Sequence, residues 1–295
     1  MQQAGRSDAC SGDGLAPAEL IVVGTGIQWA SQTTLAAQRA MQLADRVLFA
    51  VADPWAARWI RELSPTAEAL EYPRDGRPRQ SIYRDMVDRI LAALADSARV
   101  CAVFYGSPAM LTQPANDAIL RARQAGYGAS MLPGVSFLDC LFVDLGIDPG
   151  DLGCQIMEAG DFVLRKRDPD IHSHLVLCQI GLIGNRSVFD ASAQPRIRGA
   201  LELLVRRLQR HYSPSHECIV YEAARQPLEN PRIIRSSIEQ LCNARVSGVS
   251  TLYIPPASRA EVDEEMRAAL SALLRSSKTP AHPFDAMPSS TPHQE

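Results

Sequence analysis

The sequence AVFYGSP at residues 102–108 decides the fold, together with MLPGVS at residues 131–136, one helix further along the chain. Each stretch begins as a buried apolar strand and stops abruptly at small residues and a proline. Neighbouring strand ends of this kind expose backbone amides and carbonyls at one edge of a sheet, where open α/β sheets bind nucleotide-like ligands. The two stretches therefore predict an α/β fold with a ligand site at the strand ends.

The same alternation extends outward from these segments. In the first half, strands are expected at residues 18–23, 46–52, 100–104 and 129–132, and helices at 32–44, 55–63, 81–95, 114–125 and after Gly134. Alternating strands and helices are typical of a parallel sheet with helices on its faces. In the second half, strands at 162–164, 175–180, 218–221 and 251–254, with helices at 194–211 and 238–243, predict a mixed sheet.

We therefore predict a two-domain α/β fold. An N-terminal domain has a mainly parallel sheet with flanking helices, and a C-terminal α/β domain has a mixed sheet. The expected divisions are a disordered N-terminus at 1–17, the two domains at 18–145 and 146–257, a C-terminal helix at 258–275 and a disordered tail at 276–295. The helix is expected because Ser258-Arg259-Ala260-Glu261 fits a capping box.

Composition excludes several classes of protein. The chain has 295 residues and a net charge of −3 with both signs interspersed, which argues against binding to nucleic acid or to an acidic membrane. Residues 1–14 lack the apolar core of a signal peptide, and no apolar run is long enough to span a membrane. Seven cysteines without a C-x-x-C motif indicate free thiols in a reducing, cytoplasmic environment rather than disulfides or a metal site.

The first strand ends in Gly24-Thr25-Gly26, which resembles the start of a dinucleotide fingerprint. The third glycine of that motif would fall on Trp29, so the sequence disfavours a nicotinamide dinucleotide site. The two glycines fit a tight strand-to-helix turn whose backbone can still approach a ligand.

A second group of candidates is Tyr72, Arg79 and Tyr83, around a charged loop. Arg79 and Tyr83 are four residues apart, so they share a helix face, and Arg79 lies where the helix dipole disfavours a cation. A bound partner would explain that placement. The alternative to a functional role is a structural one, in which Tyr83 is the first residue of the apolar face of the helix and Arg79 is solvated.

Other candidates also have plain structural alternatives. Tyr105 ends a strand, so it lines the expected cleft or else is a core tyrosine with a satisfied hydroxyl. Ser107 and Ser136 are placed to cap helices, which is compatible with ligand binding. His172 and His174 are expected to be a surface pair. Trp55 and Trp59 are expected in the core or on a dimer surface, and Asp53-Pro54 in a turn.

Six motifs together resemble one known family. They are GTG at 24–26, ADP at 52–54, VFYGSP at 103–108, MLPGVS at 131–136, LCQIG at 177–181 and STLYIPP at 250–256. The chain resembles the tetrapyrrole methylase superfamily of S-adenosylmethionine (SAM)-dependent methyltransferases. Residues 125–148, together with Cys154 and Gln179 at matching positions, are most similar to the borosin peptide α-N-methyltransferases. The resemblance covers about residues 20–256.

The resemblance implies SAM in a cleft between two domains, with S-adenosylhomocysteine (SAH) as product, and a homodimer whose subunits share a substrate channel. The implied catalytic residues are Tyr72, Arg79, Tyr83 and Tyr105. The expected cofactor site comprises Gly24, Gly26, Tyr105, Gly106, Ser107, Met110, Ser136, Gln179 and Ser250. Two departures from the family stand out: Ala69 replaces a tyrosine, and the loop between Tyr72 and Arg79 is one residue longer.

The expected activity is repeated α-N-methylation of backbone amides in a ribosomally made precursor peptide. The chain ends in Ser/Thr/Pro/His-rich sequence without a Val/Ile/Gly run. We therefore expect the precursor as a separate chain, in a heterotetramer with the homodimer. A tyrosine whose pKa is lowered by a guanidinium would accept the amide proton. The alternatives are a small-molecule, tetrapyrrole-type methyltransferase and a non-catalytic protein that binds SAM or a peptide.

Overall fold

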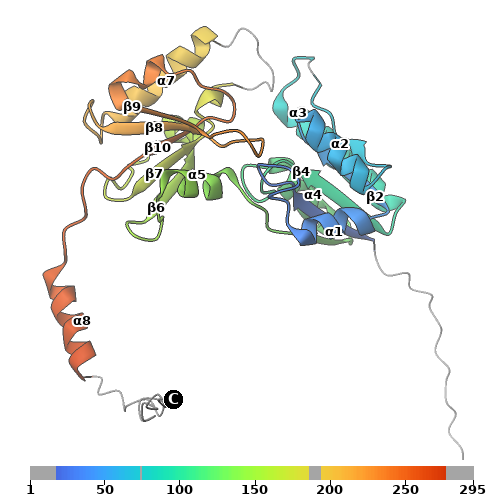
Figure 1. Cartoon of the computed structure of the whole chain (residues 1–295), viewed down its shortest axis with the longest axis horizontal. Coiled ribbons are helices and arrows are strands. Elements are labelled where there is room, and N and C mark those ends of the chain that lie inside the picture. Colours follow the sequence, from blue (N-terminus) through green and yellow to red (C-terminus); the bar gives the residue numbers. More distant parts are fainter. Residues whose placement is uncertain (1–17, 74, 186–193, 277–295) are drawn as a thin grey trace, which may run out of the picture. The chain divides into compact units, whose positions relative to one another are not determined.

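A computed structural model describes residues 18–73, 75–185 and 194–276 (Figure 1). It divides into two compact units, residues 1–257 and 258–295. Disorder was predicted for residues 1–17 and 276–295. Of these, Ser276 is the last residue of a helix, and the rest, Cys10 included, lie outside the described residues. The fold class is confirmed, since one sheet is parallel and the other mixed. The division of residues 18–257 into two domains at residue 145 stays a prediction.

The first sheet has five parallel strands in the order β3-β2-β4-β1-β5. These are β1 (Glu19–Gly24), β2 (Arg46–Ala50), β3 (Glu68–Ala69), β4 (Arg99–Phe104) and β5 (Gly128–Met131). Four of them confirm predicted strands. The fifth, β3, was not predicted. It has two residues, too few to show the alternation of apolar and polar residues that marks a strand.

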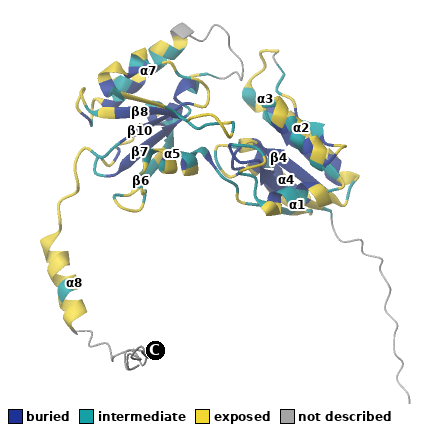
Figure 2. Cartoon of the chain, in the orientation of Figure 1, coloured by how far each residue is buried: buried dark blue, intermediate teal, exposed yellow. Residues whose placement is uncertain are grey.

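Helices cover both faces of this sheet because its strands are apolar on both sides. Alternate residues of β4 point in opposite directions, so Cys101 and Val103 lie in one buried cluster and Ala102 and Phe104 in another. The first cluster contains residues of α1 (Leu35–Leu43) and α2 (Pro54–Leu63), and the second contains residues of α3 (Arg79–Ala95) and α4 (Gln113–Gln124). Figure 2 shows the strands as the buried layer.

The order of the strands creates a switch point between β1 and β4. The chain leaves β1 through α1 on one face and leaves β4 through α4 on the other. The loops after these adjacent strands therefore diverge and leave a crevice at their carboxyl ends, as doubly wound sheets do.

The second sheet also has five strands, in the order β6-β7-β10-β8-β9. They are β6 (Cys154–Glu158), β7 (His174–Cys178), β8 (Glu217–Glu222), β9 (Arg232–Ser237) and β10 (Thr251–Ile254). Only β6 and β7 are parallel to each other. One face packs against α6 (Ala159–Leu164), η1 (Ile180–Leu182), α7 (Gln194–Leu208) and η2 (Ile238–Asn243), and the other against α5 (Phe137–Leu145).

Several local predictions were wrong. Residues 162–164 belong to the helix α6, not to a strand, because the Glu158 side chain accepts a hydrogen bond from Asp161 N at 2.6 Å and caps that helix. The edge strands β6 and β9 were missed. Their sequences, CQIME and RIIRSS, do not alternate apolar with polar residues.

The C-terminal unit contains α8 (Glu264–Ser276). The capping box predicted at Ser258 was wrong, because the helix begins six residues later. The Asp263 side chain accepts a hydrogen bond from Met266 N at 2.9 Å, which supplies a cap there. Among the described helices, none combines the length and apolar character needed to cross a membrane.

Candidate functional site

A cavity of about 230 Å³ lies at the carboxyl ends of the strands of the first sheet. Two walls enclose it, one from each sheet. The wall from the first sheet and the segments beside it comprises Ile27, Ala50, Tyr72, Tyr83, Phe104, Tyr105, Gly106, Ser107, Met110, Leu111, Thr112, Pro114, Ser136 and Phe137. The wall from the second sheet comprises Gln179, Ala223, Arg225, Gly248, Val249 and Thr251.

Glycines allow the loops after β1 and β4 to cross at the cavity. Gly26 and Gly106 pair through two backbone hydrogen bonds of 3.2 and 3.0 Å. A Cβ built on Gly24 would lie 2.0 Å from the Gly106 carbonyl oxygen, so no larger residue fits. Gly24 and Gly26 are absent from the cavity lining, and their structural role is to let Gly106 reach it.

Tyr105, Gly106, Ser107 and Met110 line the cavity in the turn after β4, where the sequence predicted them. Tyr105 is 37% exposed. Partial burial raises the pKa of its hydroxyl to about 12, and the Arg225 guanidinium acts in the opposite direction. Tyr105 is therefore neutral near pH 7 and presents both a donor and an acceptor.

Ser136 lines the cavity and also caps α5. Its hydroxyl accepts hydrogen bonds from Leu138 N and Asp139 N, and the Asp139 carboxylate accepts one from Ser136 N at 2.6 Å. The reciprocal capping box fixes the start of the helix. The predicted cap is confirmed, and it holds Ser136 at the cavity.

Two non-glycine residues in the lining have left-handed backbone conformations. Gln179 has a φ of +60°, and Leu111 has a φ of +53°. Such a conformation costs about 1–2 kcal/mol for an L-residue and concentrates at functional sites. At Gln179 it ends β7 and begins η1, and the predicted site residue lies in the lining.

Ser250 does not line the cavity, although the sequence placed it in the cofactor site. It is fully buried, and its hydroxyl donates to the Glu222 carboxylate. Its neighbours Gly248, Val249 and Thr251 line the cavity instead. Because β10 runs antiparallel to β7, the beginning of β10 lies beside the end of β7 and therefore beside Gln179.

Tyr72, Tyr83 and Arg79 form the predicted cluster. The two tyrosine rings meet edge to face with centroids 6.4 Å apart, and both line the cavity. Arg79 is the first residue of α3 and is absent from the lining, yet it lies close enough to lower the pKa of both phenols. Burial outweighs that effect and raises both pKa values, so the expected lowered tyrosine pKa is not found in this state of the protein.

Arg225 and its neighbour Gln226 were missed by the sequence analysis. Arg225 lines the cavity, and Gln226 Nε2 donates to Asp53 Oδ2 at 2.8 Å, which joins the loop after β8 to the turn after β2. The available signal was position: both residues follow a predicted strand, as Tyr105 does.

Other candidates lie apart from the cavity. His174 is buried rather than on the surface, because its Nδ1 is 2.7 Å from the Tyr253 hydroxyl. Within residues 18–73, 75–185 and 194–276, no group of side chains has the makings of a metal site, and the six described cysteines are free. Trp55 is 60% exposed, whereas Trp59 packs on the first sheet and against Trp29.

Comparisons with known proteins identify a family and a related fold for this chain. Residues 19–242 match the family model of the tetrapyrrole (corrin/porphyrin) methylases. A uroporphyrin-III C-methyltransferase from Thermus thermophilus, solved in complex with S-adenosyl homocysteine, superposes with a TM-score of 0.54 at 18% identity, covering 80% of this chain and 97% of that one. At this identity the likeness concerns the fold.

Closer relatives in sequence carry both a methyltransferase and a peptide precursor in their names. The "methyltransferase/ribosomally synthesized cyclic peptide dendrothelin A precursor" of Dendrothele bispora is 39% identical over 259 residues, covering 85% of this chain and 60% of that protein. The omphalotin A precursor of Omphalotus olearius is 38% identical, covering 81% and 58%. A type I borosin cyclic peptide precursor of Coprinopsis marcescibilis is 34% identical, covering 94% and 72%.

The chain thus spans about 60% of the length of several of these relatives. The family expected from the motifs is confirmed by a match over most of the chain. This chain is a member of the tetrapyrrole methylase family of SAM-dependent methyltransferases, related within it to the borosin methyltransferases.

Proposed function

We propose that this protein uses SAM to methylate backbone amide nitrogens of a ribosomally made precursor peptide, repeatedly along that peptide. The observation that carries the proposal is a single cavity lined both by Tyr72 and Tyr83, next to Arg79, and by the strand-end residues Gly106 and Gln179. The names of the borosin relatives support a peptide as substrate.

The strand-end residues fit SAM. Gly106 lines the cavity, and a Cβ built on it would meet only one neighbouring atom, Ile27 Cδ1 at 3.4 Å, so the glycine leaves backbone open to a ligand. Gly106, Ser107, Met110, Ser136 and Gln179 would hold the cofactor with backbone groups, hydroxyls, an amide and an apolar surface. When bound, SAM supplies an electrophilic methyl group on a positively charged sulfur.

The peptide amide needs activation, because its nitrogen lone pair is delocalised into the carbonyl. In the proposed mechanism the amide nitrogen gives its proton to water that reaches the cavity from solvent, and the methyl group takes its place. Arg79 donates a hydrogen bond to the amide oxygen and stabilises the negative charge that develops there. Tyr72 and Tyr83 are neutral phenols at pH 7, since burial raises both pKa values. They would donate to the same oxygen and hold the amide plane, which aligns the nitrogen for transfer.

Tyr105 completes the proposed catalytic group. It lies in the turn after β4, next to the backbone of Gly106, and it is half-exposed in the cavity. Its hydroxyl would position the amide nitrogen at the junction between the cofactor residues and the Tyr72–Tyr83 pair.

The proposal has two finer parts. We propose that the precursor is a separate chain, which the experiment below distinguishes from a peptide carried on the same chain. We also propose a homodimer that binds two precursor chains, as the resemblance to the borosin enzymes implies.

The test is to co-express the chain with the short reading frame nearest its gene and to sequence both products by tandem mass spectrometry. Methyl groups on backbone nitrogens of the separate peptide would support the proposal. Methyl groups on the chain itself would contradict the separate precursor. SAM binding without any methylated peptide would indicate a non-catalytic binding protein, and methylation of a tetrapyrrole would indicate a small-molecule enzyme.

A further inference from the structure

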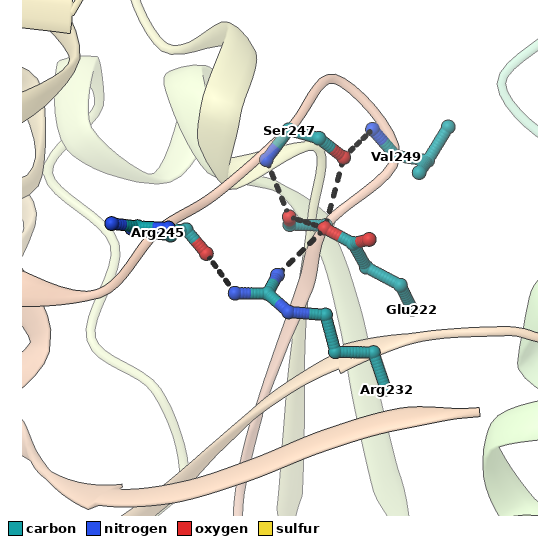
Figure 3. Close-up of polar contacts among 6 residues, drawn as sticks. Glu222, Arg232, Arg245, Ser247 and Val249 are labelled. Atoms are coloured by element: carbon teal, nitrogen blue, oxygen red, sulfur yellow. Dashed lines mark hydrogen bonds and ion pairs between the residues drawn. The ribbon is translucent and has the colours of Figure 1, made fainter. Parts of the chain in front are cut away.

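Glu222 is the last residue of β8, and its side chain lies beside Ser247 and Arg232 (Figure 3). Its Oε1 accepts hydrogen bonds from Ser247 Oγ at 2.9 Å, from Arg232 Nη1 at 3.0 Å and from Ser250 Oγ. The side chain is 19% exposed and is absent from the cavity lining. One partly buried carboxylate oxygen therefore accepts three hydrogen bonds, and its residue does not line the cavity.

The two serines are the outer residues of a four-residue turn. Ser250 N donates to Ser247 O at 3.2 Å, and Ser247 N donates to Ser250 Oγ at 2.7 Å. The central residues of the turn, Gly248 and Val249, both line the cavity. Glu222 is therefore bonded to both ends of a turn whose middle forms the wall.

The same turn is joined to the Gln179 segment. Ile180 N, the residue after Gln179, donates to Ser250 O at 3.0 Å. Arg232, directly opposite Glu222 on β9, donates through Nη2 to Arg245 O at 2.5 Å, where the segment before the turn begins. The Glu222–Arg232 pair thus fixes the turn both directly and through the chain that leads into it (Figure 3).

We propose that Glu222 is a positioning residue for the cofactor pocket. It holds Gly248 and Val249 in the cavity wall, and Ser250 acts through this turn rather than by contacting the cofactor. This inference rests on the proposed function, because it assigns the wall beside Gln179 to SAM binding. Charge-assisted hydrogen bonds are about twice as strong as neutral ones, so removing the charge should loosen the turn.

The test measures SAH affinity by calorimetry for the wild type, Glu222→Gln and the matched control Glu217→Gln. Glu217 is also on β8 and pairs with Arg235 on β9 at 2.6 Å, but at the other end of the strand. We expect Glu222→Gln to weaken SAH binding about tenfold and Glu217→Gln to change it less than about twofold. Hydrogen exchange at Gly248 and Val249 should speed up only in Glu222→Gln.

A second pair of variants keeps the inference testable if Glu222→Gln fails to fold. Ser247 is exposed. Ser247→Ala should weaken SAH binding about threefold to fivefold, whereas Ser247→Thr, which retains the hydroxyl, should bind as the wild type does. Wild-type affinity in Glu222→Gln or in Ser247→Ala would overturn the inference and leave the proposed function intact. If the wild-type protein itself does not bind SAH, the proposed function fails, and this inference fails with it.

Discussion

The two walls of the cavity are built in different ways. The first wall depends on backbone: Gly24 allows the loops after β1 and β4 to cross at a distance that a Cβ on this residue would prevent. The second wall depends on side chains: Glu222 and Arg232 hold the turn that carries Gly248 and Val249. A backbone crossing is fixed by residue size, whereas a polar network is fixed by charge and hydrogen bonding. The walls should therefore respond differently to mutation.

The largest effect is expected for Gly24→Ala in the first wall. The new Cβ would lie 2.0 Å from the Gly106 carbonyl oxygen, so the β1 and β4 loops must separate. We expect a loss of about 2–3 kcal/mol in the free energy of unfolding, measured by urea denaturation, together with loss of SAH binding. Gly128→Ala, on β5 of the same sheet, is the control, because the nearest atom to its Cβ would be 3.8 Å away. Equal stability of the two variants would break the comparison.

A large effect on catalysis, but not on cofactor binding, is expected at the Tyr/Arg cluster. Arg79→Ala removes the proposed donor to the amide oxygen and should lower the turnover of the precursor peptide about 100-fold, with SAH affinity within about twofold of the wild type. Tyr83→Phe should lower turnover about tenfold. Arg84→Ala, at an exposed position on the same helix, should match the wild type. Unchanged turnover in Arg79→Ala would remove Arg79 from the mechanism.

An intermediate effect is expected in the second wall for Gln179→Gly. The variant loses the amide that lines the cavity, so SAH affinity should fall about tenfold by calorimetry. It also relieves the left-handed conformation, so the free energy of unfolding should stay within about 1 kcal/mol of the wild type or rise. Ala30→Gly relieves the same kind of conformation, at a φ of +63°, outside the cavity lining and should leave SAH affinity unchanged. Tight binding by Gln179→Gly would show that backbone shape alone forms this wall.

The smallest effect is expected on the pH dependence of stability. Burial raises the pKa of Tyr105 from 10.0 to about 12, so the neutral phenol is favoured in the folded protein. Its contribution to stability is fully present below pH 10 and is lost as the pH rises through 12. The urea midpoint should therefore fall above pH 10, and slightly less steeply in Tyr105→Phe. A steeper fall in that variant would contradict the direction of the pKa shift.

Sequence patterns located the first wall better than the second. The stretch at residues 102–108 predicted β4 and a ligand site at its end, where Tyr105, Gly106 and Ser107 line the cavity, because parallel strands place all their carboxyl ends at one edge. In the mixed sheet this rule fails. Gly248 and Val249 precede β10, and only the antiparallel pairing with β7 brings them beside Gln179. Strand direction is a property of the assembled sheet, so the sequence did not show that Gly248 and Val249, rather than Ser250, line the cavity.

The chain's local sequence determined most of its elements, its family and the grouping of Arg79 with Tyr83. The elements depend on side-chain period and on glycine and proline at strand ends, and the Arg79–Tyr83 pair depends on its four-residue spacing. The family was expected from the resemblance of motifs such as VFYGSP and MLPGVS. Tertiary structure alone decided which groups face the cavity, that Ser250 bonds to Glu222, and that burial raises the tyrosine pKa values where a nearby guanidinium would lower them. The physical reason is that burial and hydrogen-bond partners are set by residues far apart in the chain.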